Sequence, residues 1–350
     1  MVQDNRSRIE RIVETNATFL RVLAGPGTGK TYALTRRVAR LFRDGAAPER
    51  MLVCTFTRTA ARDLETELSH LGVEGVDKIN TGTIHSFCFH LLAQSDDLEL
   101  TGRVPRALLS FEECFLLEDL KGMGFGGIRD RRKRLQVFNA AWARLQTDDP
   151  GWPQDPVDRT FQLILLGWLR FHEAMLIGEL VPETLRYLRD NPLSPYRRAF
   201  DHVLVDEYQD LNRAEQVLLD LLAEGGTLTV IGDEDQSIYS FKYAHREGIS
   251  QFAIFHPNTH DEDLIECRRC PHIIVEMANE LIATNGNRES RTLRVRPENP
   301  EGEVYVLQWR SIEEEAGGIA EFIRTRLDAG DIEAGRILVL APRRQFGYAT

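Results

Sequence analysis

The sequence predicts an α/β fold, a parallel sheet with helices on both faces, interrupted by an all-helical insertion. Short apolar runs alternate with stretches of helical periodicity, as expected for parallel strands joined by crossover helices. A glycine-rich segment, 25–29, separates the first apolar run from the first helical stretch. Between 89 and 198 the strand-like runs vanish and helical patterns remain. We therefore expect one α/β domain formed by 1–88 and 199–265, with 89–198 as a helical insertion.

The apolar runs place the strands of this domain in order along the chain. Four runs of strand length are found, at 20–24, 51–55, 202–205 and 227–231. Helical patterns follow the first three, with apolar positions spaced for one buried face, through Leu34–Leu41, Ala60–Leu68 and Leu211–Leu222. Further on, strand-like runs at 304–307 and 336–340 flank a helical pattern over 313–327. We read 266–350 as the start of a second α/β domain, left incomplete.

Composition excludes several classes of protein. The chain has 350 residues, of which 42% are hydrophobic and 28% charged, as in ordinary globular proteins with two or three domains. No apolar run approaches the ~18 residues of a membrane span, and no signal peptide is recognisable. The five cysteines have no disulfide-framework spacing, which indicates a cytoplasmic protein with no membrane partner. A net charge of −11 disfavours indiscriminate nucleic-acid binding but leaves room for a local basic groove.

The glycine-rich segment has the pattern of a phosphate-binding loop. It reads Ala24-Gly-Pro-Gly-Thr-Gly-Lys-Thr31 and lies between a predicted strand and helix. Backbone N–H groups of Gly25, Gly27, Thr28 and Gly29 would face a phosphate at the helix N-terminus. Lys30 would reach the β- and γ-phosphates, and Thr31 would ligate Mg²⁺. The alternative is a glycine-rich turn with an incidental lysine.

A pair of acidic residues ends the third predicted strand. Asp206 is placed to bind Mg²⁺ together with Thr31, and Glu207 to orient or deprotonate the attacking water. Alone, such a pair is often part of a surface loop. Combined with the phosphate loop, it predicts an ATPase with ATP and Mg²⁺ as cofactors.

Four further blocks carry a family resemblance. They are Thr55-Phe-Thr-Arg-Thr-Ala-Ala61, Gly82-Thr-Ile-His-Ser-Phe87, Val205-Asp-Glu-Tyr-Gln-Asp210 and Ile231-Gly-Asp-Glu-Asp-Gln-Ser-Ile-Tyr-Ser240. In this order, beside the phosphate loop, they resemble the UvrD/Rep/PcrA helicases of superfamily 1. The resemblance implies a RecA-like P-loop NTPase domain that couples ATP hydrolysis to movement along single-stranded DNA, or DNA with a single-stranded tail. The family's later motifs lie beyond Thr350, so we expect the N-terminal piece of a longer, monomeric helicase that by itself turns ATP over poorly.

The resemblance also assigns roles by position. Gln236 would sense the γ-phosphate, while the DNA track would be lined by Phe56, Thr57, Arg58, His85, Tyr239, Phe241 and Lys242. Aromatic faces stack on bases without reading sequence. The alternatives are aromatic side chains in the core, His85 as part of a helix cap, and a solvated face for the basic cluster 129–134.

The stretch Cys267-Arg-Arg-Cys270 has the spacing of half a metal site. A zinc site needs four ligands, and no second such pair occurs in the sequence. Aligned with the family, Arg269 would reach the γ-phosphate, and Arg268 and Tyr32 would hold the base by stacking. Relative to the family, these two side-chain types have exchanged places. The position at which the family reads the adenine edge holds Ile9, which cannot form a hydrogen bond with a base.

A different class of function remains open at this point. An ATP-binding interaction or switch protein derived from a helicase would keep the fold without motor activity. Retention of Lys30, Thr31, Asp206, Glu207, Gln236 and Arg269 favours the enzyme.

Overall fold

The computed structural model describes residues 5–55, 58–70, 75–94, 103, 106–237, 243–245, 247–285 and 291–341. The chain divides into two compact units, 1–300 and 301–350. Among the described residues, no helix is both long enough and apolar enough to cross a membrane.

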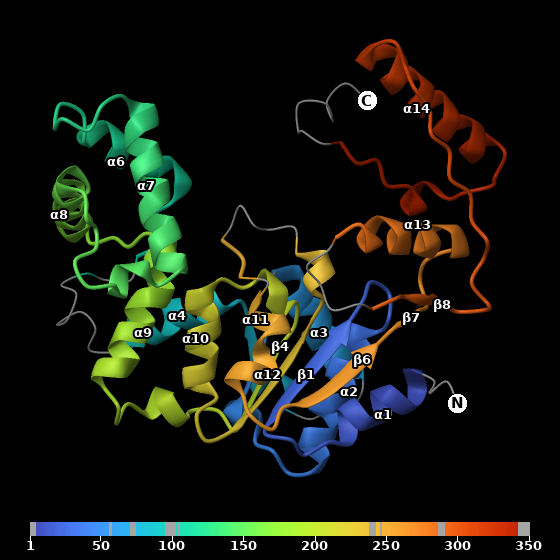
Figure 1. Cartoon of the computed structure of the whole chain (residues 1–350), viewed down its shortest axis with the longest axis horizontal. Coiled ribbons are helices and arrows are strands. Elements are labelled where there is room, and N and C mark those ends of the chain that lie inside the picture. Colours follow the sequence, from blue (N-terminus) through green and yellow to red (C-terminus); the bar gives the residue numbers. More distant parts are fainter. Residues whose placement is uncertain are drawn as a thin grey trace. The chain divides into compact units, whose positions relative to one another are not determined.

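The first unit is built on a six-stranded sheet in which every strand pair is parallel. The strand order is β3-β2-β4-β5-β1-β6, with β1 Phe19–Ala24, β2 Met51–Cys54, β3 Asn80–Gly82, β4 His202–Val205, β5 Thr227–Gly232 and β6 His260–Leu264 (Figure 1). The predicted α/β class and the four predicted strands are confirmed. The two edge strands, β3 and β6, were missed because neither has an apolar run, as is usual for strands that face solvent.

Helices cover both faces of the sheet and divide the core in two. Along β4, Val203 and Val205 point to one side and Leu204 to the other, since successive side chains of a strand alternate. The Leu204 side packs against α1 Asn5–Glu14, α2 Lys30–Arg43 and α3 Arg58–His70. The opposite side packs against α4 Ile84–Gln94, α9 Leu180–Asp190 and α10 Arg213–Leu222.

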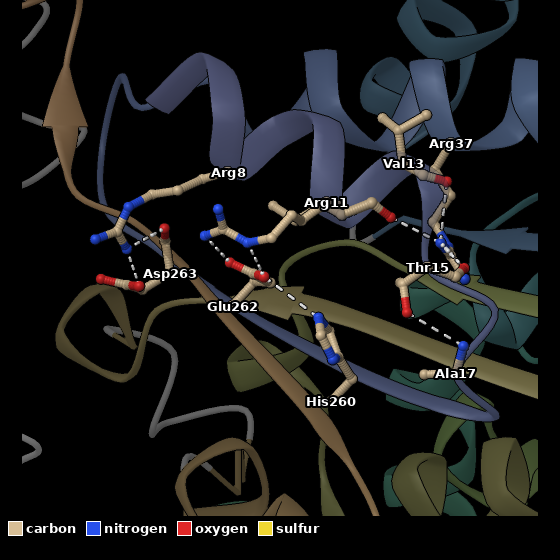
Figure 2. A network of polar contacts seen from close by, with 10 residues as sticks. Arg8, Arg11, Val13, Thr15, Ala17, Arg37, His260, Glu262 and Asp263 are labelled. Atoms are coloured by element: carbon tan, nitrogen blue, oxygen red, sulfur yellow. Dashed lines mark hydrogen bonds and ion pairs between the residues drawn. The ribbon is translucent and has the colours of Figure 1, made fainter. Parts of the chain in front are cut away.

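Helix α1 is fastened along the edge strand β6 by charged side chains (Figure 2). Arg11 donates two hydrogen bonds to Glu262, at 2.6 and 2.8 Å, and Arg8 pairs with Asp263. From α2, the buried Arg37 donates to the backbone oxygens of Ile12 and Thr15 at 2.7 and 3.0 Å, which satisfies carbonyls at the end of α1. These contacts cover an edge strand that would otherwise be exposed, and they hold α1 beside the start of α2.

The insertion has a core of its own. Its helices are α6 Ser110–Asp119, α7 Ile128–Ala143 and α8 Pro156–Phe171, followed by α9, and the described residues between 89 and 198 contain no strand. Leu116, Phe138, Phe161 and Leu165 are fully buried between α6, α7 and α8. The predicted all-helical character is confirmed, while the predicted domain boundaries stay predictions.

After β5 the chain forms α11 Glu247–Ser250 and α12 Phe252–Phe255 before β6. A second, small parallel pair then forms from β7 Glu266–Cys267 and β8 Arg294–Val295, with α13 His272–Ala283 between them. In the second unit, the predicted helix is confirmed as α14 Ile312–Asp328. The predicted strands at 304–307 and 336–340 are wrong. Residues 304–307 and 337–340 have no regular secondary structure, and Arg336 ends the 3-10 helix Ala334–Arg336. A strand needs a hydrogen-bonded neighbour, and the described residues supply none to these runs.

Candidate active site

The phosphate loop joins β1 to α2 at the carboxyl edge of the sheet. Gly27 and Gly29 have φ values of 68° and 99°, a backbone conformation that residues with side chains rarely adopt. Gly29 is the N-cap of α2, and the Thr28 hydroxyl donates to the Gly25 carbonyl at 2.8 Å, which closes the loop. The loop is thus preformed as an anion site at a helix N-terminus.

Two predicted site residues from distant segments, Glu207 and Gln236, contact Lys30. Its ammonium Nζ lies 2.8 Å from Glu207 Oε2 and 3.3 Å from Gln236 Oε1. The lysine side chain is largely buried, whereas the Glu207 side chain is one-third exposed to solvent. The structure therefore brings the phosphate loop, the acidic pair and the predicted γ-phosphate sensor to one place.

The acidic pair has a geometry suited to two different tasks. Asp206 is buried and accepts a hydrogen bond from the backbone N–H of Glu207 at 3.0 Å. Burial, and then the charge of Glu207, raise the pKa of Asp206 to about 6, against the opposing effect of Lys30. Glu207 has φ 52°, a conformation rare for a residue with a side chain and typical of functional sites.

The oxygen donors present fit a hard divalent cation. Asp206 offers a buried carboxylate whose charge is unfavourable without a nearby cation, and Thr31 offers an exposed hydroxyl on the first turn of α2. Mg²⁺ prefers such oxygen ligands together with phosphate oxygens and water.

Two polar residues that the sequence left without a role complete a hydrogen-bonded ring. Gln209 is fully buried, donates to Glu207 Oε2 at 2.9 Å and accepts from the Asp233 N–H at 2.9 Å. Asp233 in turn accepts from Gln236 Nε2 at 2.9 Å. A Cβ on Gly232 would lie 2.2 Å from Gln209 Oε1, so a larger residue there would displace the Gln209 amide from its two hydrogen bonds. The signal for Gln209 in the sequence is its position in the Asp-Glu-Tyr-Gln-Asp block, two residues after Glu207.

Arg291 was also missed by sequence reasoning. Its guanidinium lies 3.5 Å from Asp233 and 3.6 Å from Glu234, and it is mostly buried. It precedes β8, and Leu293 of the same segment is clamped by Asn279, whose side chain exchanges hydrogen bonds with the Leu293 backbone at 3.0 and 2.9 Å. No local pattern in the sequence marks Arg291, because its partners lie 57 and 58 residues away.

The Cys267–Cys270 stretch lies against the phosphate loop. The Arg268 N–H donates to the Gly27 carbonyl at 2.9 Å, and a Cβ on Gly27 would lie 2.8 Å from Arg269 Cβ. Asn299 donates to the carbonyls of Cys267 and Cys270 at 3.0 and 2.8 Å, which holds the stretch as a tight loop. Throughout the described part of the chain, no group of three or more potential metal ligands is found. The contacts with Gly27 place Arg268 and Arg269 beside the phosphate loop.

A cavity of about 600 Å³ lies next to this loop and is lined by Tyr32, Arg268 and Ile9. Most of the lining residues are charged, and they form three ion pairs: Arg6–Glu10 at 3.6 Å, Arg268–Glu266 at 3.5 Å and Arg296–Glu298 at 2.8 Å. The Arg36 guanidinium also lies 5.1 Å from the Tyr32 ring centroid. The predicted base-stacking residues thus share one cavity with the isoleucine predicted to replace an edge-reading side chain.

The predicted DNA-contact residues are described only in part. His85 is half-buried, and its Nδ1 lies 3.2 Å from Glu215 Oε1, in the N-terminal capping box of α10. Phe56, Thr57, Tyr239, Phe241 and Lys242 lie outside the described residues, as does the side chain of Arg58. In the basic cluster, Arg131 is buried and Arg134 pairs with Asp158, whereas the other three cations are exposed, namely Arg129, Arg132 and Lys133.

Comparisons with known proteins identify relatives of the chain. Residues 9–242 match the family described as AAA domain. The chain is 31% identical over 307 residues to the ATP-dependent DNA helicase PcrA of Bacillus subtilis, covering 84% of this chain and 41% of the relative. It is 28% identical to the PcrA helicases of Staphylococcus epidermidis, over 84% of this chain and 42% of the relative, and of Staphylococcus aureus, over 83% and 41%. The chain thus spans about two fifths of the length of these relatives.

Proposed function

The chain belongs to the UvrD/PcrA-like helicases of superfamily 1, and from this premise we propose that it hydrolyses ATP to drive movement along single-stranded DNA. The proposal extends to DNA with a single-stranded tail as substrate and to a monomer as the working form. The relatives are named ATP-dependent DNA helicases, which supports ATP as the nucleotide and DNA as the substrate of the proposed movement.

One observation carries the catalytic part of the proposal. Lys30 Nζ contacts Glu207 and Gln236 at 2.8 and 3.3 Å, although these residues are 177 and 206 positions away in the sequence. A lysine held between a catalytic base and a polar sensor is placed to be transferred to phosphate oxygens when nucleotide binds. That transfer would release Glu207 from its ion pair, so its carboxylate could accept a proton from water. Nucleotide binding would then activate Glu207 as the catalytic base.

Gln236 is suited to report on the terminal phosphate. Its oxygen contacts Lys30 and its amide nitrogen donates to Asp233, so any movement of Lys30 alters the support of Gln236. Among the residues that follow, Ser237 donates to the Gln209 carbonyl at 3.4 Å, the His245 carbonyl accepts from Gln216 in α10, and Tyr243 contacts Gln136 in the insertion. The γ-phosphate state would thereby be passed to the predicted DNA contacts, with Arg269 completing the charge around the phosphate.

Mg²⁺ would be held by Asp206 and Thr31, where it would neutralise phosphate charge during transfer. The base would lie in the cavity beside the loop, stacked between Tyr32 and Arg268. Along the DNA track, His85 and the other predicted contacts would bind the single strand through stacking and charge.

The test is a comparison of Glu207→Gln with Lys30→Ala in the intact protein. The amide keeps the shape of Glu207 but cannot accept a proton, so DNA-stimulated ATP turnover should fall by roughly 10²–10⁴-fold while nucleotide affinity is kept. Lys30→Ala should weaken nucleotide binding as well. If wild-type protein bound ATP but single-stranded DNA did not stimulate its turnover, a nucleotide switch without motor activity would replace this proposal.

A further inference from the structure

The short segment Tyr243–His245 is tied to the motor domain on one side. Ala244 forms an antiparallel bridge with Asn212, and the His245 N–H donates to the Leu211 carbonyl at 2.8 Å. The fully buried Gln216 donates to the His245 carbonyl at 2.9 Å. These anchors lie at the N-terminus of α10, directly after the acidic pair and its ring of hydrogen bonds.

On its other side, the segment reaches the insertion through the side chain of Tyr243. The phenol hydroxyl donates to the Gln136 carbonyl in α7 at 3.1 Å. The guanidinium of Arg144, the C-cap residue that follows α7, lies 5.7 Å from the centroid of the Tyr243 ring, within the range of a cation–π contact. One side chain thus touches the middle of α7 and its C-terminal end.

The backbone of Tyr243 is in an unusual conformation. Its φ is 64°, in the left-handed region, which a bulky side chain rarely adopts. Such a conformation persists only when surrounding contacts hold it, and here they come from α10 and α7 together. Glycine would adopt this conformation without strain, so local backbone preference does not account for a tyrosine at this position.

From these contacts we infer that Tyr243 is a latch that fixes the helical insertion to the motor domain, at the end of the segment carrying the γ-phosphate sensor. It is a positioning residue, since the described contacts of its side chain are with Gln136 and Arg144 and not with Lys30 or the acidic pair. Its neighbours Ala244 and His245 contact Asn212 and Leu211, which closely follow Gln209 of the hydrogen-bonded ring in the chain, so the latch connects α7 to the residues that hold Glu207 and Gln236. The functional part of this inference rests on the proposed motor activity, while the mechanical part does not.

The mechanical part is tested by hydrogen exchange on peptides that cover α7, in the intact protein without nucleotide. Tyr243→Phe removes the hydroxyl bond and keeps the ring, so α7 amides near Gln136 should exchange about two- to tenfold faster. Tyr243→Gly removes both contacts and relieves the backbone, so exchange should rise further although the loop itself is unstrained. Tyr196→Phe is the matched control, because its hydroxyl donates at 3.0 Å to Gln94 and not to α7. Unchanged exchange in α7 for both Tyr243 variants would overturn the latch.

The functional part is tested by ATP turnover of the same variants, with and without oligo(dT). Turnover without DNA should be unchanged, because the ring of contacts around Lys30 is intact. The stimulation by DNA should fall severalfold in Tyr243→Gly and less in Tyr243→Phe. If hydrogen exchange in α7 were faster in the variants but DNA still stimulated their ATP turnover fully, the coupling role of Tyr243 would be refuted. Absence of stimulation in wild-type protein would instead refute the proposed motor, and hydrogen exchange would still decide on the latch.

Discussion

Replacing Asp206 by asparagine should stabilise the protein in the absence of divalent cations. In the fold, burial raises the pKa of Asp206 to about 6, from 3.8. A carboxyl with a raised pKa binds its proton more tightly when folded, so its ionisation costs stability as pH rises. From the two pKa values, this cost is about 0.5 kcal/mol at pH 4 and rises to about 3 kcal/mol at pH 8. Asparagine keeps an oxygen for the Glu207 N–H but carries no charge.

The assay is urea unfolding of wild type and Asp206→Asn in the presence of EDTA, at pH 4, 6 and 8. We expect the variant to gain roughly 1–3 kcal/mol over wild type at pH 8, with the gain shrinking toward pH 4. Added Mg²⁺ and ATP should reverse the order, because a charged carboxylate binds the cation more strongly than a neutral amide oxygen does. A variant that was less stable at pH 8, or a difference that did not depend on pH, would refute the electrostatic reasoning.

Asp201→Asn is a control of opposite sign. Its carboxylate accepts two hydrogen bonds from Arg50, both at 2.6 Å, and this pairing lowers the pKa of Asp201. The stability from this pair is present above the unfolded pKa and is lost as pH falls through the lowered folded value. Asp201→Asn should therefore destabilise the protein at pH 8 and have little effect in acid.

Two further predictions concern nucleotide turnover and binding. Arg291→Ala should lower the DNA-stimulated turnover number roughly three- to tenfold with little change in the KM for ATP, because it removes a partner of Asp233, which in turn holds Gln236. Steady-state kinetics should show partial rescue by Arg291→Lys and no effect of the control Arg294→Ala. A change in KM alone would contradict this role for Arg291. In a titration with fluorescent nucleotide, Tyr32→Arg should weaken binding by placing two cations around the base, and Arg268→Tyr alone should weaken it less. The double variant should recover much of the affinity that Tyr32→Arg loses. Strictly additive losses would mean that the two side chains do not share the base.

Much of the fold was predictable because its signals are local. A buried parallel strand needs apolar residues on both faces, so β1, β2, β4 and β5 appear as apolar runs in the sequence. The edge strand β6, His-Asp-Glu-Asp-Leu, has no such run. Its charges are compensated by Arg8, Arg11 and Arg21, which lie about 240–255 positions away and can be assigned to it only in three dimensions.

The runs at 304–307 and 336–340 show the opposite failure. Their residues have strand propensity, yet neither run forms a strand. A strand is completed by hydrogen bonds with a neighbouring strand and not by its own side chains. In the site, Tyr32 and Arg268 were predicted as a pair by resemblance, and the shared cavity is consistent with that pairing.

Three parts of the candidate site could be predicted from the amino-acid sequence: a glycine loop with Lys30, an acidic pair after a buried strand, and a glutamine after the next strand. These signals are local because each depends on backbone conformation at the carboxyl end of one strand. Only the tertiary structure decided which side chains hold them in place. Gln209, Asp233 and Arg291 act through hydrogen bonds and ion pairs between segments far apart in the chain, and Tyr243 depends on a helix more than a hundred residues earlier. Contacts of that kind leave no periodicity in a sequence, since their geometry exists only after the sheet has formed.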